Sequence, residues 1–271
     1  MLTVAPNGGR KTKADCPALP LTADELARTA AECLERGASM IHLHVRDAEG
    51  QHSLDPEAYR AAIGSICQEV GDRLVVQITS ESIGRYSPDE QRAAVLKTNP
   101  EAVSLALREL APEGAEEKDF GGFLGKLKQK RIWPQIILYT PEEAQRLGAM
   151  VKQGPIPFDK PSVLYVLGRF ALTGTALPRD ILPFLAPGMP RFESWSVCAF
   201  GRRETACVTA GALLGGHGRV GFENNLVLPG GARAASNAEL VDAAARALEA
   251  VGLGTQTAEG LREEIAGALG A

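Results

Sequence analysis

Two histidines separated by one residue form the pattern in this sequence that is most typical of a chemical site. His42 and His44 lie in the run Ile-His-Leu-His-Val-Arg-Asp at residues 41–47. Side chains alternate along a strand, so the two imidazoles would point the same way, whereas Leu43 would face the opposite side. Paired imidazole nitrogens suit zinc, iron or manganese. Two polar residues satisfied by ordinary hydrogen bonds would give the same pattern, and the pair alone does not separate these interpretations.

A carboxylate at the end of the last apolar segment is the candidate third ligand. The segment Gly218–Phe222 is predicted to be a strand, and its period of two places Arg219 and Glu223 on one face. Three protein ligands would leave one coordination position open for substrate or water. The alternative is a surface carboxylate paired with Arg219. We expect His217, at the start of this strand, to have a structural role at the opposite end, and His52 to be solvated in a polar loop.

Other polar side chains follow the earlier apolar segments and could act beside a cation. Thr79 and Glu81 share a face at the end of one segment, where a hydroxyl or a carboxylate would assist proton transfer. Ser104 and Arg108 follow the next segment and are candidate substrate contacts. The N-terminal loop, residues 7–11, is glycine-rich and cationic and contributes Asn7 and Arg10. It is consistent with an anion-binding loop and equally with a mobile surface loop.

The elements that must position these residues alternate along the chain between short apolar runs and longer helical patterns. Capping sequences predict four helix starts, at Thr22, Ser87, Thr140 and Ser236, each followed three residues later by glutamate. The predicted strands are near-continuous apolar runs, as expected of a parallel sheet buried on both faces. They are Leu2–Ala5, Met40–Val45, Leu74–Thr79, Ala102–Leu105, Ile132–Tyr139, Ser162–Leu167, Trp195–Ala199 and Gly218–Phe222.

This alternation predicts the fold class. Eight strands and about as many helices within 271 residues fit a (β/α)₈ TIM barrel, whose active sites lie at the C-terminal ends of the strands. A doubly wound open sheet shares the alternation, but no G-x-G-x-x-G sequence follows the first strand. We find no repeat or linker that would divide the chain. We therefore predict a single catalytic domain over residues 1–271.

Composition narrows the class of protein. Hydrophobic residues make up 45% of the chain and charged residues 23%, with a net charge of −4. This balance lacks the basic excess expected of a protein that binds nucleic acid or an anionic membrane surface. We expect neither a signal peptide nor a membrane span. The five cysteines form no C-x-x-C pair, which is typical of reduced thiols, so we expect a cytoplasmic enzyme or scaffold.

Motifs along nearly the whole chain resemble the β-keto acid cleavage enzyme family. The resemblance implies a barrel, usually oligomeric, in which His42, His44 and Glu223 hold a divalent cation, typically zinc. It also implies transfer of the acyl part of a β-keto acid to coenzyme A, with acetyl-CoA as co-substrate and acetoacetate released. The motifs are Lys13-Ala14-Asp15 with Pro17 and Leu19-Pro20, residues 41–47 with Ser53-Leu54-Asp55, Val166-Leu167-Gly168, residues 215–225 and Ser236–Val241.

The sequence departs from the family pattern at the residues that transfer a proton. Asn224 replaces the aspartate assigned as the base, and an asparagine does not accept a proton at neutral pH. The serine partner of that aspartate is replaced by Thr79, which keeps the hydroxyl. Glu81 is then the leading substitute base, and a metal-bound hydroxide is the alternative. Arg219, beside the metal, would hold a carboxylate or orient the base.

A second group of departures concerns the substrate. The family's type reaction uses an aminated substrate, 3-keto-5-aminohexanoate. Arg10 falls near the carboxylate that would bind the amine, and Gln135 and Ile137 replace acidic residues. A cation at this position would reject an amine and favour an anionic or neutral tail. We therefore expect the metal and scaffold of the family to be retained, but a different β-keto acid to be the substrate.

Three functions fit these residues. The first is acyl exchange between a β-keto acid and acetyl-CoA in a homo-oligomer, dimer or tetramer. The second is another metal-assisted reaction, such as an aldolase-like cleavage or a hydrolysis by metal-bound water. Amidohydrolases also begin with H-x-H, but need further histidines on later strands, and this chain has only His52 and His217 besides the pair. The third is a non-catalytic, metal-binding derivative of the family, suggested by Asn224.

Overall fold

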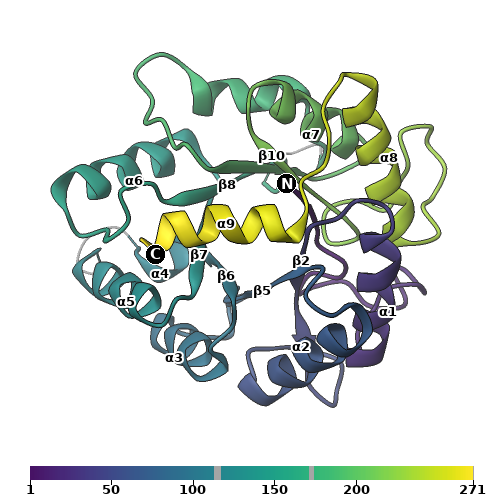
Figure 1. Cartoon of the computed structure of the whole chain (residues 1–271), viewed down its shortest axis with the longest axis horizontal. Helices are drawn as coiled ribbons and strands as arrows, with labels where there is room; N and C mark the ends of the chain where they lie inside the picture. The colour runs from purple at the N-terminus through teal and green to yellow at the C-terminus, as the bar shows by residue number, and fades with distance from the viewer. Residues whose placement is uncertain (113–116, 171–173, 271) are drawn as a thin grey trace.

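Eight parallel strands close into a barrel in the computed structural model, which describes residues 1–112, 117–170 and 174–270 (Figure 1). The hydrogen-bonded order is β1-β10-β9-β8-β7-β6-β5-β2, closing on β1. The (β/α)₈ prediction is confirmed, and the closure excludes an open doubly wound sheet. The barrel strands are β1 (Leu2–Val4), β2 (Met40–Leu43), β5 (Val75–Thr79), β6 (Ala102–Ala106), β7 (Trp133–Leu138), β8 (Ser162–Leu167), β9 (Trp195–Ala199) and β10 (His217–Val220).

Helices surround this barrel, and most begin where the sequence predicts. Thr22 and Ser87 form complete capping boxes. Thr140 and Ser236 also cap through their hydroxyls, but the paired glutamate bonds the backbone one residue earlier than a capping box requires. The helices are α1 (Ala23–Leu34), α2 (Pro56–Val70), α3 (Pro88–Thr98), α4 (Leu107–Leu110), α5 (Glu117–Gln129), α6 (Pro141–Gln153), η1 (Pro178–Leu185, a 3₁₀ helix), α7 (Glu204–Leu213), α8 (Asn237–Ala250) and α9 (Ala258–Leu269). None of the described helices is long and apolar enough to cross a bilayer.

Helix α9 lies across the end of the barrel at which the strands begin (Figure 1). Arg262 of this helix donates hydrogen bonds to the carbonyls of Asp72 and Leu74, just before β5. The same guanidinium pairs with Glu101, just before β6. At the same end, the amino group of Met1 lies 2.8 Å from Nδ1 of His217, which has the structural position predicted for it. The other end, where the strands finish, is left for a site.

The second strand differs from its prediction in a way that shapes the site. β2 ends at Leu43 rather than at Val45, and the chain turns into a small antiparallel hairpin of β3 (Val45–Arg46) and β4 (His52–Ser53). Gly50 closes the turn with φ of +75°, and its backbone N–H donates to the carbonyl of Asp47 at 3.0 Å. The hairpin brings residue 52 back beside the end of β2.

Candidate metal centre

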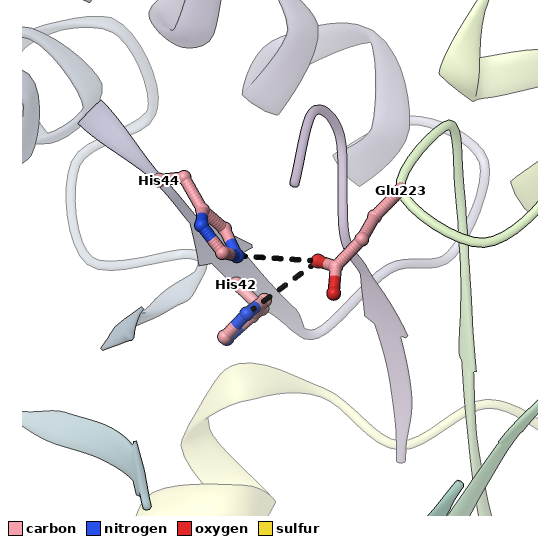
Figure 2. A group of neighbouring side chains, drawn as sticks. All are labelled: His42, His44 and Glu223. Carbon is pink, nitrogen blue, oxygen red and sulfur yellow. Dashed lines mark ion pairs between the residues drawn. The ribbon is translucent and has the colours of Figure 1, made fainter. Parts of the chain in front are cut away.

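Three side chains from the two ends of the chain converge at the C-terminal end of the barrel (Figure 2). Oε2 of Glu223 lies 3.6 Å from Nε2 of His42 and 3.5 Å from Nε2 of His44. One ligand atom from each residue lies within 4.8 Å of the other two, a separation that a single ion can bridge. Both imidazoles are buried and Glu223 is 14% exposed. The predicted alternation of the two histidines therefore brings both to one point.

The hydrogen bond to His42 fixes which of its nitrogens faces this point. Nδ1 of His42 lies 2.8 Å from Oε1 of Gln77, its neighbour across the β2–β5 ladder. A carbonyl oxygen only accepts, so Nδ1 carries the proton and Nε2 is left with a lone pair. A hydrogen bond of this kind orients a histidine that binds a metal.

His44 is contacted by a histidine that the sequence analysis placed in solvent. Nδ1 of His44 lies 3.4 Å from Nδ1 of His52, and Nε2 of His52 lies 2.7 Å from the carbonyl oxygen of Glu81. His52 is 1% exposed, so the prediction of a solvated residue is wrong. The error arose because the turn that carries residue 52 back to the strand end is set by tertiary structure. The signal available in the sequence was a glycine turn, at Gly50, between two β-type stretches.

Burial and charge keep the three candidate ligand side chains in the protonation states that metal binding requires. Burial lowers the pKa of His42 to about 4 and that of His44 to about 3, so both imidazoles are neutral near pH 7. Burial alone would raise the pKa of the Glu223 carboxyl. The charge of the buried Arg219 outweighs it and holds that pKa well below its usual range.

The unpaired atoms of the site fit a divalent cation. Nε2 of His44 and Oε2 of Glu223 are buried and have no hydrogen-bond partner among the described residues. Two such acceptors facing each other are costly unless something positive lies between them. Two imidazole nitrogens and one carboxylate are a common ligand set of catalytic zinc, with a further position open. The residues present therefore fit the metal that the sequence analysis predicted.

The side chain of Glu223 lies over the segment that follows β1, the strand between β10 and β2 in the sheet, and in this way approaches the histidines. Gly8, after β1, has φ of +63°, and a Cβ atom there would lie 2.6 Å from Cγ of Glu223. Lys11 donates to the carbonyl oxygen of Glu223 at 2.7 Å. The glycine-rich N-terminal loop thus packs against the site, and the absence of a side chain at Gly8 allows the carboxylate to approach.

A buried carboxyl group secures the turn that carries Glu223. Glu204, at the start of α7, accepts hydrogen bonds from the backbone N–H of Gly221 at 3.1 Å and from Nδ2 of Asn225 at 3.3 Å. Burial raises the pKa of Glu204 well above its ordinary value. Gly221 has φ of +136°, and a Cβ there would meet the carbonyl oxygen of Ala5 at 2.4 Å. Glu204 could not be recognised from the sequence, because its partners come from the loop after β10.

Asn7, predicted as a substrate contact, has a positioning role in the structure. Its side-chain NH₂ donates to the carbonyls of Pro20 and His44, at 2.9 and 2.8 Å. Its side-chain oxygen accepts from the backbone N–H of His44 at 3.2 Å. Asn7 is fully buried, and both amide hydrogens are used within the protein. It therefore holds the backbone of a candidate metal ligand and has no free donor for a substrate.

Glu81 lies beside the three candidate ligands, and its carboxyl has a raised pKa. Its Oε2 is 3.9 Å from Nδ1 of His44, and its Oε1 is 3.7 Å from Nη2 of Arg169. Burial, followed by the charge of Glu223, raises the pKa of Glu81 to about 7. Thr79 accepts a hydrogen bond from the backbone N–H of Glu81 at 3.0 Å and so fixes the start of this turn. Arg169 follows β8 and was missed, although it lies at a strand end like the other candidates.

The remaining residues predicted at strand ends differ in how deeply they are buried. Ser104 is fully buried, with its hydroxyl 3.5 Å from that of Thr79. Arg108 lies at the rim, where it pairs with Glu143 at 2.6 Å and stacks over the ring of Tyr139. Arg10 is exposed and acts on Glu81 through its charge, lowering the pKa of that carboxyl.

Arg219 has more donors than partners. Its Nη2 donates to Oε1 of Glu223 at 3.1 Å and to the sulfur of Cys198 at 3.4 Å. Its Nε and Nη1 are buried with no hydrogen-bond partner among the described residues. Asn224 is buried as well, with Nδ2 3.9 Å from the same sulfur and its side-chain oxygen unpaired within the described chain. The five cysteines are all free, in agreement with the prediction of unpaired thiols.

A narrow pocket has these polar groups on one side and an apolar wall on the other. On the ligand side it is lined by the histidine pair, Glu223, Arg219, Thr79 and Glu81. On the side of β6 to β8 it is lined by Ala106, Ile137 and Val166, which pack with Leu164 and Cys198 into a separate apolar cluster. Tyr139, Phe200 and Arg169 complete the described part of the lining.

Comparison with known proteins shows the family to which the chain belongs. The beta-keto acid cleavage enzyme family matches residues 1–266, and the chain belongs to this family. It is 30% identical over 272 residues to the 3-keto-5-aminohexanoate cleavage enzyme of Fusobacterium nucleatum, covering 97% of this chain and 96% of that protein. It is 27% identical over 261 residues to the 3-oxoadipate:acetyl-CoA acetyltransferase of Cupriavidus necator, covering 93% and 89%.

Solved structures support the fold. The complex of ObcA with oxaloacetate has a TM-score of 0.69 and 18% identity, covering 92% of this chain and 67% of that one. At this identity the likeness concerns the barrel and not the reaction. Membership of the family and the confirmed fold make the chain a barrel protein of a family whose named members act on keto acids.

Proposed function

We propose that this protein catalyses acyl exchange between a β-keto acid and acetyl-CoA, giving acetoacetate and a new acyl-CoA. The observation that carries the proposal is the convergence of His42, His44 and Glu223 at the mouth of a pocket in a chain of this family. The reaction is balanced without any other reactant. The keto acid gives its acyl group to coenzyme A and receives the acetyl group in its place.

The three converging residues are the proposed ligands of one divalent cation, with zinc favoured by the nitrogen-rich set. When bound, such a cation would supply Lewis-acid polarisation of the substrate's keto oxygen. His42 and His44 meet it as neutral imidazoles, and Glu223 as a carboxylate. Gln77 and Asn7 keep the histidines in place through the contacts described above.

Glu81 is the proposed base. Its carboxyl lies in the pocket beside His44, and its pKa of about 7 balances proton acceptance and release near neutral pH. It would take a proton from the carbon between the keto and carboxylate groups. That carbon would then attack the acetyl carbonyl, and the C–S bond would break to release the coenzyme A thiolate. The thiolate would attack the original keto carbon, the C–C bond would break, and Glu81 would return the proton to form acetoacetate.

Asn224 has no basic group for this step and lies against Cys198, so we assign it a place beside the pocket and not the transfer of the proton. Thr79 would position Glu81 through its hydrogen bond to the backbone. Arg219 is proposed to hold the substrate carboxylate, because its buried Nε and Nη1 donors lack partners among the described residues and belong to a side chain that lines the pocket.

The substrate's tail is proposed to lack an amine. The wall formed by Ala106, Ile137 and Val166 carries no charge, and an ammonium group against it would lose its hydration without a partner. Arg169, which lines the pocket, and the exposed Arg10 and Arg108 would repel an amine from the rim. These contacts support a neutral or anionic tail and argue against 3-keto-5-aminohexanoate. Arg10, Arg108 and Ser104 stay proposed as secondary substrate contacts.

A substrate panel tests the reaction class. The purified protein, loaded with zinc, is incubated with acetyl-CoA and β-keto acids whose tails are apolar, anionic or aminated. We expect acetoacetate and acyl-CoA in equal amounts, with the aminated acids the poorest substrates, and Glu223→Gln as the inactive control. Turnover without any thioester would instead favour an aldolase-like cleavage or a hydrolysis. Absence of turnover with metal still bound would favour a non-catalytic derivative.

The assembly and location are further parts of the proposal. We expect a cytoplasmic homo-oligomer, a dimer or a tetramer, that interacts with small molecules and not with nucleic acid or membrane. The net charge of −4 is consistent with the expectation that neither nucleic acid nor a membrane surface is a partner. Light scattering coupled to size-exclusion chromatography measures the assembly, and a monomeric mass at all concentrations would contradict it.

A further inference from the structure

The hairpin of β3 and β4 places a third histidine behind the metal centre. His52 is 1% exposed, and its ring centroid lies 5.1 Å from that of His44 with an angle of 55° between the ring planes. It is not a ligand candidate, because the residues that could share one ion are His42, His44 and Glu223. A buried imidazole in this position needs a role other than coordination.

The contacts of His52 determine where its protons lie. Nε2 is 2.7 Å from the backbone carbonyl oxygen of Glu81, which only accepts, so Nε2 of His52 carries the proton. Nδ1 of a neutral His52 is then an acceptor. Nδ1 of His44, 3.4 Å away, is the group that faces it and must donate. Nε2 of His44 is consequently left with a lone pair directed at Glu223.

The geometry points to His52 as the residue that fixes the tautomer of His44 and links it to the backbone of Glu81. His42 has the corresponding device in Gln77, so each of the two histidine ligands has one dedicated hydrogen-bond partner behind it. This inference rests on the metal centre proposed above. It adds a positioning role for His52, which lies outside the H-x-H motif.

The hairpin itself is built to hold His52 in place. Arg46 pairs with His52 in the β3–β4 ladder, and the Arg46 guanidinium donates to the carbonyl oxygens of Gly8 and Lys11 in the N-terminal loop. Arg85 donates to the carbonyl oxygen of His52 at 3.0 Å. The backbone of His52 is therefore anchored on both sides. Substitution of its side chain is expected to change the hydrogen bonds to His44 and Glu81 more than the path of the chain.

Metal affinity of the full-length protein tests this role without reference to turnover. The probe is Zn²⁺ alone, titrated into metal-free protein in competition with a chromophoric chelator near pH 7.5. His52→Phe keeps a ring but removes both hydrogen bonds, and we expect it to weaken zinc binding by about 10- to 100-fold. His52→Gln retains an acceptor and a donor on one side chain. We expect it to recover most of the lost affinity.

His217 provides the matched control, because it is another histidine, partly buried in its case, that lies at the opposite end of the barrel. His217→Phe should bind zinc as the wild type does, even if it lowers the melting temperature. Wild-type zinc affinity in His52→Phe would overturn the inference, as would equal losses in His52→Phe and His52→Gln. If His52→Phe fails to fold, the Gln variant decides: near wild-type affinity agrees with the role, and a loss like that expected of Phe contradicts it. Wild-type protein that binds no zinc would overturn the metal centre as well, which separates the two failures.

Discussion

The two sides of the pocket are held together by different forces. On the side of β2 and β10, each ligand side chain has at least one polar partner: Gln77 for His42, His52 for His44 and Arg219 for Glu223. On the side of β6 to β8, the side chains of Ala106, Ile137 and Val166 pack in an apolar cluster, and only their backbones take part in hydrogen bonds, those of the barrel strands. A polar network fails when one member is removed, whereas a packed wall accepts changes of shape. The difference suggests that one side fixes the chemistry and the other the choice of substrate.

The largest effect is expected from the polar side, at Glu223. Glu223→Gln removes the anionic ligand and leaves the buried Arg219 without its charge partner. We expect zinc affinity to fall by more than about 100-fold, beyond the range for loss of an outer hydrogen-bond partner, and turnover to disappear. Chelator competition and the acetoacetate assay measure the two. Glu101→Gln, at the opposite end of the barrel, is the control and should bind zinc and turn over as the wild type does. Equal losses of zinc affinity and turnover in the two variants would contradict the placement of the metal centre at the C-terminal end.

Glu81 should give the next largest effect, together with a pH dependence. Loss of a general base costs about 10²- to 10⁴-fold, so Glu81→Gln should reduce kcat by that factor while zinc still binds. The base works as the carboxylate, and its pKa is raised to about 7, so wild-type kcat/KM should decrease as the pH falls below about 7. A bound cation would move this limb toward lower pH. A full rate in Glu81→Gln, or no acidic limb in the wild type, would assign the base elsewhere.

Substitutions on the apolar side should have a different effect, a change in which substrate is preferred. Ile137→Glu places a carboxylate on the uncharged wall, and we expect the preference for neutral over aminated β-keto acids to shift by about 10- to 100-fold toward the amine. Ile137→Gln has nearly the same shape without the charge and should not shift it. Ratios of kcat/KM for the two substrate classes provide the measurement. An unchanged ratio in Ile137→Glu would show that the tail of the substrate lies elsewhere.

The smallest effect is expected at the rim. Arg108 is 37% exposed, pairs with Glu143 and stacks on Tyr139, and exposed pairs of this kind contribute less than about 1 kcal/mol to stability. Arg108→Gln should therefore leave the melting temperature nearly unchanged. As a secondary substrate contact it should raise KM with kcat retained. A fall in kcat comparable to that of Glu81→Gln would move Arg108 from the rim into the chemistry.

Local sequence predicted most of the fold. The strands Ser162–Leu167 and Trp195–Ala199 have the predicted bounds, because apolar runs buried on both faces are continuous and these two are followed closely by glycine, at Gly168 and Gly201. The prediction extended β2 too far, since Val45 has the residue type of a strand but pairs with Ser53 in a separate hairpin. That pairing depends on a turn followed by a second short strand, which periodicity over a few residues does not reveal.

The site was predictable to the extent that it follows from strand ends. His42, His44 and Glu223 could be brought together because barrel closure places the last strand on one side of the first strand and the second strand, which carries the histidines, on its other side. His52 was misplaced and the positioning role of Asn7 was not foreseen, because both depend on contacts with backbone carbonyls of distant segments, such as those of His44 and Glu81. Residue type gives no sign of such partners, so these supporting residues required the structure.

The most direct test of the central claim is a crystal structure of zinc-loaded protein with anomalous diffraction recorded above the zinc edge. We predict one strong peak about 2.0–2.2 Å from Nε2 of His42, Nε2 of His44 and a carboxylate oxygen of Glu223. A peak at other residues, or none at these three in protein that binds zinc stoichiometrically, would contradict the metal centre and the reaction built on it.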